Sequence, residues 1–389
     1  MPDDLADRLP TPAELAAGAW PAVSAVLPVL NEERHLADAV GAILAQDYPG
    51  ALEVVLALGP SRDATAAVAA ALVAGDRRIR TVANPGGSTP AALNAAIAAT
   101  THPVVVRVDG HAALGAGYVR RAVELLVQTG ADNVGGLMDA RGVGPFEVAV
   151  ARAMTSRWGI GGAVFHTGGA GGPADSVYLG VFRRTALVRV GGFDEHYRRA
   201  QDWELNLRLR RSGGVVWFSP DLRVQYRPRS SWRGLATQFA GSGRWRRQLV
   251  RRHPETAGLR YLAPPLVTLA VGAGALLAVG APVVRAVTDR LAVTVPTARA
   301  RRAAGLTALL GTRARLGWLP AAAYGAGVLV AASRESAGLP AGARVRLPAV
   351  FAVMHLSWGL GFLRGAPPPG APPPGAPSPA AARAPQPFP

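Results

Sequence analysis

The tripeptide Asp109-Gly110-His111 follows an apolar run at positions 104–106 and could bind a divalent cation. Side chains two positions apart on an extended chain point to the same side, so this carboxylate and imidazole would face one site together. Oxygen and imidazole ligands suit Mn²⁺, or Mg²⁺ with more water in its shell. A cation there would bridge a diphosphate and neutralise the charge of a leaving group. Taken alone, the tripeptide favours the alternative of an aspartate that caps the next turn, because short motifs often match by chance.

A second candidate for chemistry is Asp202, at the start of a predicted helix over residues 202–211 that ends before Gly213. The helix dipole favours an ionised carboxylate at this end, and an ionised carboxylate is what a general base requires. The alternative is a capping residue, followed by an i,i+4 surface pair of Glu204 and Arg208. The two interpretations are compatible.

Two further groups of residues could contact ligands. Polar or turn residues after the first two predicted strands could meet a nucleoside, although helix capping is the alternative: Pro28, Asn31, Glu32 and Asp63. Downstream, Arg244 offers a bidentate fork to phosphate, and Trp245 offers a flat face to a sugar or a membrane interface. A juxtamembrane basic segment is the alternative for this second group.

An α/β domain must position these residues. Four short apolar runs are predicted as strands, at 23–27, 53–58, 80–83 and 104–108. Helices fit between them, with Asn31 as a predicted N-cap and Thr89-Pro90 opening another helix; a further short helix is predicted over 185–190. This alternation predicts a doubly wound, mostly parallel sheet. Ligands of such sheets bind beyond the carboxyl ends of the strands, so we expect the loops at 28–32, 59–63 and 109–111 to converge.

Composition divides the chain into parts. The 389 residues carry a net charge of +17, all of it from arginine, and 49% are hydrophobic. Cysteine is absent, which excludes disulfides and thiolate metal sites. Apolar runs at 262–284, 316–332 and 347–363 are predicted membrane spans, and the arginines beside them favour an anionic membrane surface over nucleic acid. We predict four parts: an N-terminal extension (1–20), a catalytic domain (21–255), membrane-associated helices (262–364) and a disordered Pro/Ala/Gly-rich tail (365–389).

The topology of the membrane region stays open. We expect a multi-pass protein of the cell membrane with a cytoplasmic catalytic domain. Three spans would place the arginine-rich segment 285–315 outside, against the positive-inside rule. Either 262–284 is re-entrant or interfacial, or a further short span lies near 291–311.

Several segments together resemble the inverting family 2 glycosyltransferases with a GT-A fold, and most closely their membrane-associated branch similar to succinoglycan-biosynthesis glucosyltransferases. The resemblance is carried, in order, by residues 23–33, 84–94, 106–112, 129–136, 177–184, 191–208 and 354–363. It implies a nucleotide-sugar donor, a divalent metal (Mn²⁺ or Mg²⁺) and a lipid-linked or saccharide acceptor. The implied reaction is hexosyl transfer in exopolysaccharide or cell-envelope glycan synthesis.

The resemblance also assigns residues. Asp109 and His111 match the family's Asp-X-Asp motif, and Asp202 matches its presumed base. It adds Asn94 to the donor site, and Asp194 and Glu204, with the downstream arginine and tryptophan, to the acceptor or phosphate site.

The sequence departs from the family's pattern at two positions, and these departures limit what the resemblance implies about the nucleotide and the type of reaction. Leu58 stands where the family usually has a uracil-contacting Asp, so UDP is not implied over other nucleotides. The Gln of the processive members' Gln-X-X-Arg-Trp motif is replaced by Gly241, which argues against a polymer-extruding synthase.

Two other functions are compatible with parts of the pattern. A sugar-nucleotide nucleotidyltransferase would share the sheet and the metal-binding Asp, but it needs a Gly-rich basic loop after the first strand, where Pro28-Val-Leu-Asn-Glu stands. A non-enzymatic basic membrane scaffold would explain the charge and the spans, but not the segments around Asp109 and Asp202.

Overall fold

A computed structural model describes residues 8–294 and 315–365. Its first part alternates strands and helices: α1 (Pro12–Ala16), β1 (Val23–Val29), α2 (Leu36–Leu44), β2 (Leu52–Leu58), α3 (Thr65–Gly75), β3 (Ile79–Ala83), α4 (Thr89–Ala98), β4 (Val104–Arg107), β5 (Ala113–Leu114) and α5 (Tyr118–Thr129). The four predicted strands and the helices between them are confirmed. The predicted cap at Asn31 is wrong, because α2 begins five residues later and Asn31 has a left-handed backbone with a φ of 57°.

The second part is less regular. It comprises β6 (Asn133–Ala140), α6 (Pro145–Met154), α7 (Arg157–Ile160), α8 (Val164–Thr167), β7 (Gly172–Pro173), β8 (Tyr178–Arg183), α9 (Arg184–Arg189), α10 (Gln201–Arg211), β9 (Val216–Tyr226) and α11 (Trp232–Arg252). The short helix predicted over 185–190 is α9, and the helix predicted over 202–211 is α10.

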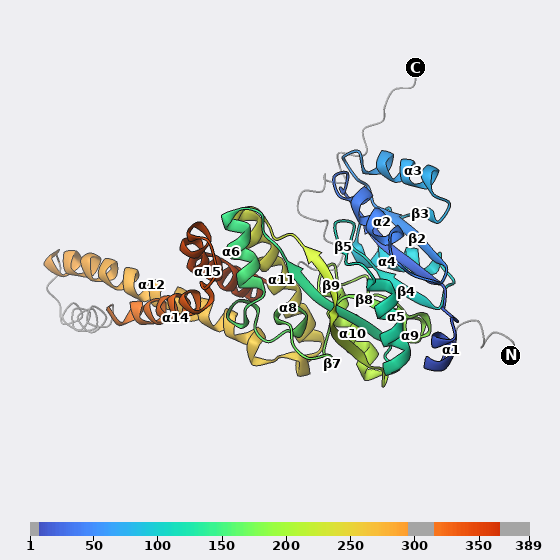
Figure 1. Ribbon diagram of the computed structural model, residues 1–389. Coiled ribbons are helices and arrows are strands. Elements are labelled where there is room, and N and C mark those ends of the chain that lie inside the picture. Colours follow the sequence, from blue (N-terminus) through green and yellow to red (C-terminus); the bar gives the residue numbers. More distant parts are fainter. Residues whose placement is uncertain (1–7, 295–314, 366–389) are drawn as a thin grey trace, which may run out of the picture.

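All the strands form one sheet in the order β3-β2-β1-β4-β8-β6-β9-β5, with β7 also paired to β9 (Figure 1). Strands β3, β2, β1 and β4 are parallel, as predicted. Beyond β4 the sheet is mixed, since β8 is antiparallel to both of its neighbours and β6 is parallel to β9. The parallel strands are apolar on both faces because helices cover both faces.

Each face of the sheet has its own core. Val23, Ala25 and Leu27 of β1 point to the α2 and α5 side, where Leu36 and Val123 are fully buried. The intervening residues of β1 point to the opposite side, where α4, α9 and α10 pack. Because the two layers of helices fix the sheet, the carboxyl ends of the parallel strands form a rigid edge.

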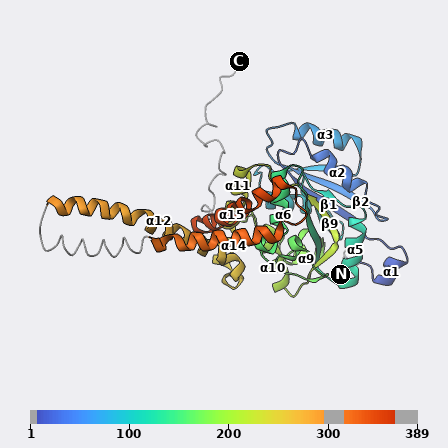
Figure 2. The same ribbon diagram turned by 60° about the vertical axis from the view of Figure 1, so that its left-hand side comes forward.

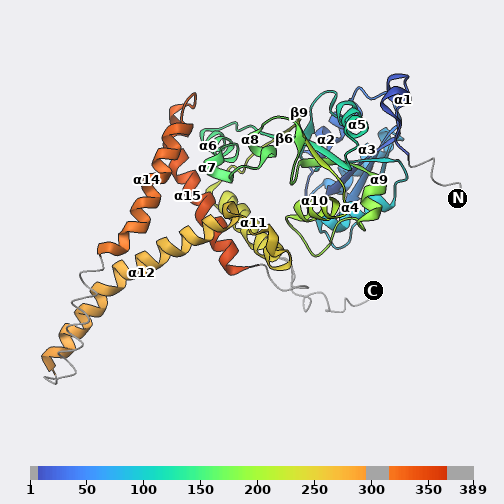
Figure 3. The same cartoon turned by 90° about the horizontal axis from the view of Figure 1, so that it is seen from below.

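The C-terminal helices project from this domain (Figures 1 and 3). They are α12 (Leu259–Thr294), α14 (Leu319–Glu335) and α15 (Ala341–Arg364), with short 3₁₀ turns at Pro254–Thr256 and Arg315–Trp318. Three stretches are long and apolar enough to cross a membrane, and they overlap the three predicted spans: Leu259–Gly280, Leu316–Glu335 and Ala341–Arg364. Most of the fourth span considered near 291–311, residues 1–7 and the tail after residue 365 lie outside the described residues.

These helices are not equivalent. α12 and α14 extend away from the sheet domain (Figure 2), whereas α15 lies along α11 and α6. A third apolar core joins α15 to α6 and α11, with Leu347, Phe351 and Met354 fully buried there. The last predicted span therefore also packs against the sheet domain.

Glycines allow α15 to approach its neighbours closely. A Cβ on Gly243 of α11 would lie 2.0 Å from the carbonyl oxygen of Trp358, and a Cβ on Gly361 of α15 would lie 2.0 Å from that of Ala240. Close backbone contact of this kind is how small residues pack helices in membranes. Gly243 thus lies on the face of α11 that packs against α15, whereas Gly241, which stands in place of the Gln of the Gln-X-X-Arg-Trp motif, faces Arg199.

We predict that Gly361→Ala destabilises the protein by about 1–3 kcal/mol, because α15 must move away from α11. The thermal midpoint of the detergent-solubilised chain should fall by about 2–4 °C per kcal/mol. The control is Gly272→Ala on α12, where a Cβ would meet nothing within 4 Å, so that the midpoint should stay or rise. Equal midpoints for the two variants would contradict this packing.

Candidate active site

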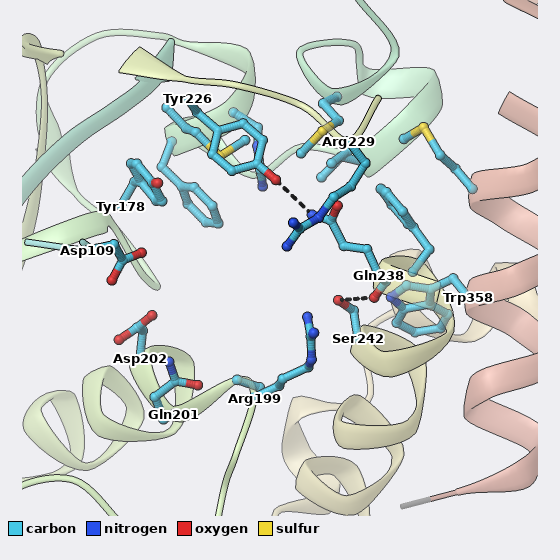
Figure 4. A pocket seen from close by; sticks show the side chains of 18 of the residues that line it. Asp109, Tyr178, Arg199, Gln201, Asp202, Tyr226, Arg229, Gln238, Ser242 and Trp358 are labelled. Carbon is cyan, nitrogen blue, oxygen red and sulfur yellow. Dashed lines mark hydrogen bonds between the residues drawn. The ribbon is translucent and has the colours of Figure 1, made fainter. Parts of the chain in front are cut away.

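The side chain of Arg107, the last residue of β4, contacts two carboxylates. They belong to Asp109 and Asp202, which lie on the same side of the cavity in Figure 4. Arg107 donates to Asp109 at 3.0 Å and forms an ion pair with Asp202 at the start of α10. The Arg107 side chain is only 6% exposed, whereas those of Asp109 and Asp202 are 21% and 38% exposed. The two predicted carboxylates therefore face the same space, although 93 residues separate them in the sequence.

That space is a cavity of about 1320 Å³. One end of the cavity is polar and is lined by Pro28, Glu32, Arg107, Asp109 and Asp202. The other end reaches α12, α14 and α15. The arrangement follows from the fold, because the loops after β1 and β4 emerge at the same edge of a parallel sheet.

His111 and Glu32 form a second polar contact at this edge. The Nδ1 atom of His111 lies 2.8 Å from Oε1 of Glu32, and this hydrogen bond raises the pKa of His111. It leaves Nε2 available as a ligand, as is usual when a carboxylate orients a metal-binding imidazole. Gly110 allows the approach, since a Cβ there would lie 3.0 Å from Cγ of Glu32.

These residues fit a divalent cation that is shared with a substrate. No group of three His, Cys, Asp or Glu side chains within 8–294 and 315–365 is arranged to hold a metal ion. Asp109 and His111 would therefore supply two ligands, and substrate phosphates and water would supply the rest. Mg²⁺ is commonly bound in this way, by one or two carboxylates together with phosphates.

The loops after β1 and β2 converge as predicted, but partly through contacts with each other. The backbone amide of Asn31 donates to Ser61, and the side chain of Asn31 accepts from the amide of Arg62 at 2.8 Å. Asp63 accepts from the hydroxyl and the amide of Thr65, and the hydroxyl bond lowers the pKa of Asp63. Neither Asn31 nor Asp63 lines the cavity; their hydrogen bonds hold the loops after β1 and β2 together.

Three further predicted residues also lie outside the cavity wall. Asn94 of α4 bonds the backbone of Phe193 in both directions, at 2.8 and 2.9 Å. Asp194 accepts from the amide of His196, and Glu204 pairs with Arg208 at the predicted i,i+4 spacing. The prediction of a surface pair is wrong, because the Glu204 side chain is buried. These contacts hold the turn that leads into α10.

Arg244 and Trp245 do not line the cavity either. The ring of Trp245 packs against His196 and Tyr197 on the outer side of α11. The helical repeat instead turns Arg246 inward, where it is buried between two aromatic rings. Its Cζ atom lies 4.0 Å from the ring centroid of Trp203 and 3.3 Å from that of Tyr261.

Arg246 connects the site to the apolar C-terminal helices. Trp203 is the neighbour of Asp202 on α10, while Tyr261 belongs to α12 and stacks on Trp358 of α15. Burial lowers the pKa of Arg246 to about 10, and the two ring faces stabilise its charge in place of water.

Residues that the sequence did not single out complete the cavity. Tyr178, Arg199, Tyr226 and Arg229 point into it (Figure 4). Arg199 is aimed there by a sharp turn at Ala200, whose φ of 62° is unfavourable for a residue with a Cβ. The sequence could have indicated Arg107, because a charged residue at the end of an apolar strand is unusual. No comparable pattern in the sequence indicates Arg199 or Arg229.

We predict that Arg107→Met lowers the free energy of unfolding by about 2–4 kcal/mol in metal-free buffer, because two carboxylates lose their common counter-ion. Arg77→Met, at an exposed arginine with no hydrogen bond or ion pair among the described residues, should change it by about 0.5 kcal/mol or less. Chemical denaturation of both variants measures the difference. Similar values would show that the ion pairs of Arg107 contribute little.

Comparisons with known proteins agree with this geometry. The profile of "Glycosyl transferase family 2" matches residues 24–191. The succinoglycan biosynthesis protein ExoA of Rhizobium meliloti (strain 1021) is 31% identical over 341 residues, which is 87% of this chain and 93% of that protein. The structure of the mannosyltransferase PcManGT from Pyrobaculum calidifontis, in complex with GDP-Man and Mn²⁺, superposes with a TM-score of 0.54 at 19% identity and covers 92% of this chain and 90% of that one. The chain therefore belongs to glycosyltransferase family 2.

Proposed function

We propose that this glycosyltransferase moves a hexose from a nucleotide sugar to a lipid-linked or saccharide acceptor, with inversion at the anomeric carbon. The observation that carries the proposal is the shared contact of Asp109 and Asp202 with Arg107 in one cavity. Exopolysaccharide or cell-envelope glycan synthesis is the proposed context, because ExoA is named for succinoglycan biosynthesis.

The donor binds at the edge formed by the loops after β1 and β4. Pro28, Glu32 and Asp109 line the cavity there, while Asn31, Asp63 and Asn94 hold the surrounding loops in place. Leu58 ends β2, so the base of the nucleotide is not assigned. A divalent ion at Asp109 and His111, Mn²⁺ as in the PcManGT complex or Mg²⁺, neutralises charge on the leaving diphosphate when bound.

Asp202 acts as the base. Its Oδ1 atom is held by Arg107, and Oδ2 has no hydrogen-bond partner among the described residues, so it can accept the proton of an acceptor hydroxyl. The hydroxyl oxygen then bonds to the anomeric carbon as the bond to the diphosphate oxygen breaks. A direct displacement of this kind converts an α-linked donor into a β-linked product.

The shape of the cavity favours the lipid-linked acceptor of the two. From the carboxylates it continues between apolar side chains of α12 and α15, among them Pro264, Val267 and Met354. Such a surface suits a hydrocarbon chain, whereas a free saccharide would leave it exposed to water.

Membrane placement follows from the same helices. Arginines on α11 and at the start of α12 precede the first apolar stretch, and such flanks favour the cytoplasmic side. We therefore propose a multi-pass protein of the cell membrane whose catalytic domain is cytoplasmic. Neither rival function is favoured, because the chain belongs to glycosyltransferase family 2 and the cavity joins both carboxylate segments.

Asp202→Asn should keep nucleotide-sugar binding and lose transfer by about 10²-fold or more, since general-base catalysis contributes that much. Turnover of a panel of nucleotide sugars by the detergent-solubilised protein measures it. Asp38→Asn, at an exposed position of α2, is the matched control and should keep full activity. Near-normal turnover of Asp202→Asn would exclude this base.

Asp109→Ala should weaken donor binding and metal dependence together, because one side chain serves both. Donor affinity with and without Mn²⁺ can be measured by the shift in thermal midpoint, since tight binding stabilises by mass action. Wild-type activity that persists in excess chelator would contradict a metal-dependent reaction.

A further inference from the structure

A smaller pocket of about 370 Å³ adjoins the catalytic cavity. Its wall is polar and carries three arginines and no carboxylate: Arg199, Arg229, Ser231, Arg233, Gly234, Thr237 and Gln238. Arg199, Arg229 and Gln238 belong to both walls, so the two spaces meet at these side chains. We call this the arginine pocket.

The three guanidinium groups of the arginine pocket lack counter-ions. Among residues 8–294 and 315–365, none of the three has an ion pair or a hydrogen bond, although arginines elsewhere pair with most of the acidic residues. Burial and then the charge of Arg229 lower the pKa of Arg199. Like charges held together in this way favour an anion between them.

The local structure holds this positive charge in place. A Cβ on Gly241 of α11 would lie 3.2 Å from Nε of Arg199, so the missing side chain makes room for the guanidinium. Ser231 caps α11 by accepting from the amide of Gly234 at 3.2 Å. The N-terminus of this 21-residue helix adds its dipole to the positive field of the pocket.

The position of the pair indicates which anion fits. Figure 4 shows Arg199 and Arg229 pointing into the cavity from opposite sides. Asp109 and Asp202 lie to one side of the pair, and Trp358 of α15 lies to the other. An anionic group held there would have the reacting carboxylates on one side and the apolar helices on the other.

We propose that Arg199, Arg229 and Arg233 bind the phosphate or diphosphate of the acceptor lipid, between its sugar and its hydrocarbon chain. The inference rests on the proposed function and assigns the residues that recognise the acceptor. Arginine suits this role because its fork binds phosphate oxygens in pairs. The alternative is that these arginines bind the diphosphate of the donor, since Arg229 is close enough to His111 for its charge to lower the pKa of that imidazole.

Binding of farnesyl diphosphate, inorganic diphosphate and farnesol to the full-length protein in detergent tests the proposal. The buffer contains chelator and no donor, so that Asp109 and His111 contribute no metal site. Isothermal titration calorimetry should show the tightest binding for farnesyl diphosphate, weaker binding for diphosphate and the weakest for farnesol. Affinity for the two charged probes should fall as salt is raised.

The double variant Arg199→Gln/Arg229→Gln should weaken farnesyl diphosphate binding by about tenfold or more, as expected for lost charged hydrogen bonds, and Arg233→Gln should weaken it less. Arg251→Gln, at an exposed arginine of the same helix outside both walls, should leave it unchanged.

Donor affinity, measured separately in Mn²⁺, should change less than twofold in these variants. An equal loss of donor affinity would assign the arginine pocket to the donor. An unchanged affinity for farnesyl diphosphate would show that the pocket binds no phosphate. Either result overturns the proposal. Because the lipid measurements need neither donor nor metal, failure of the proposed sugar transfer would be seen separately.

Discussion

The buried guanidinium of Arg107 is the contact on which the site depends. It is almost fully enclosed, and it binds a carboxylate from the end of β4 and another from the start of α10. A buried charge is costly unless it is paired, so the two elements are held at a fixed separation. The proposed donor side of the cavity, at Asp109, and the proposed base, Asp202, are thereby connected through one side chain. The loops around Glu32 and Ala200 lie further out and surround the two carboxylates that Arg107 holds.

A second constraint comes from the helices that leave the domain. Backbone contact at Gly243 and Gly361 brings α15 against α11, and Arg246 fills the space between Trp203 and Tyr261. The apolar helices therefore form part of the cavity wall. A cavity with carboxylates at one end and membrane-type helices at the other can accept a molecule that is itself polar at one end and apolar at the other.

Much of the first half of the fold is predictable from the sequence. Each of β1 to β4 is a short apolar run followed by turn residues, and a parallel sheet brings the ends of such strands together, so the joint placement of Glu32, Asp109 and His111 follows from local patterns. Asp202 is marked by its helix and by its family motif. The mixed strands β6, β8 and β9 are harder to predict, because their pairing joins glycine-rich segments that are distant in the sequence.

The errors at individual residues have physical causes. Arg244 and Trp245 are two and one positions away from Arg246, and helical phase alone decides which of them faces inward. Asn31 looks like a cap because its type is right, but its side chain bonds to the next loop instead of to a helix. Arg199 and Arg229 become partners only across the cavity, from separate elements, so no spacing along the chain reveals them.

The most direct test of the central claim, that an acceptor hydroxyl deprotonated by Asp202 displaces the diphosphate of the donor held at Asp109 in a single step, is the anomeric configuration of the product. It can be read from the proton coupling constants of the newly formed linkage by NMR, after turnover of an α-linked nucleotide sugar. Direct displacement predicts a β-linked product. An α-linked product would require a second displacement at the anomeric carbon or another retaining mechanism, and would contradict a single displacement.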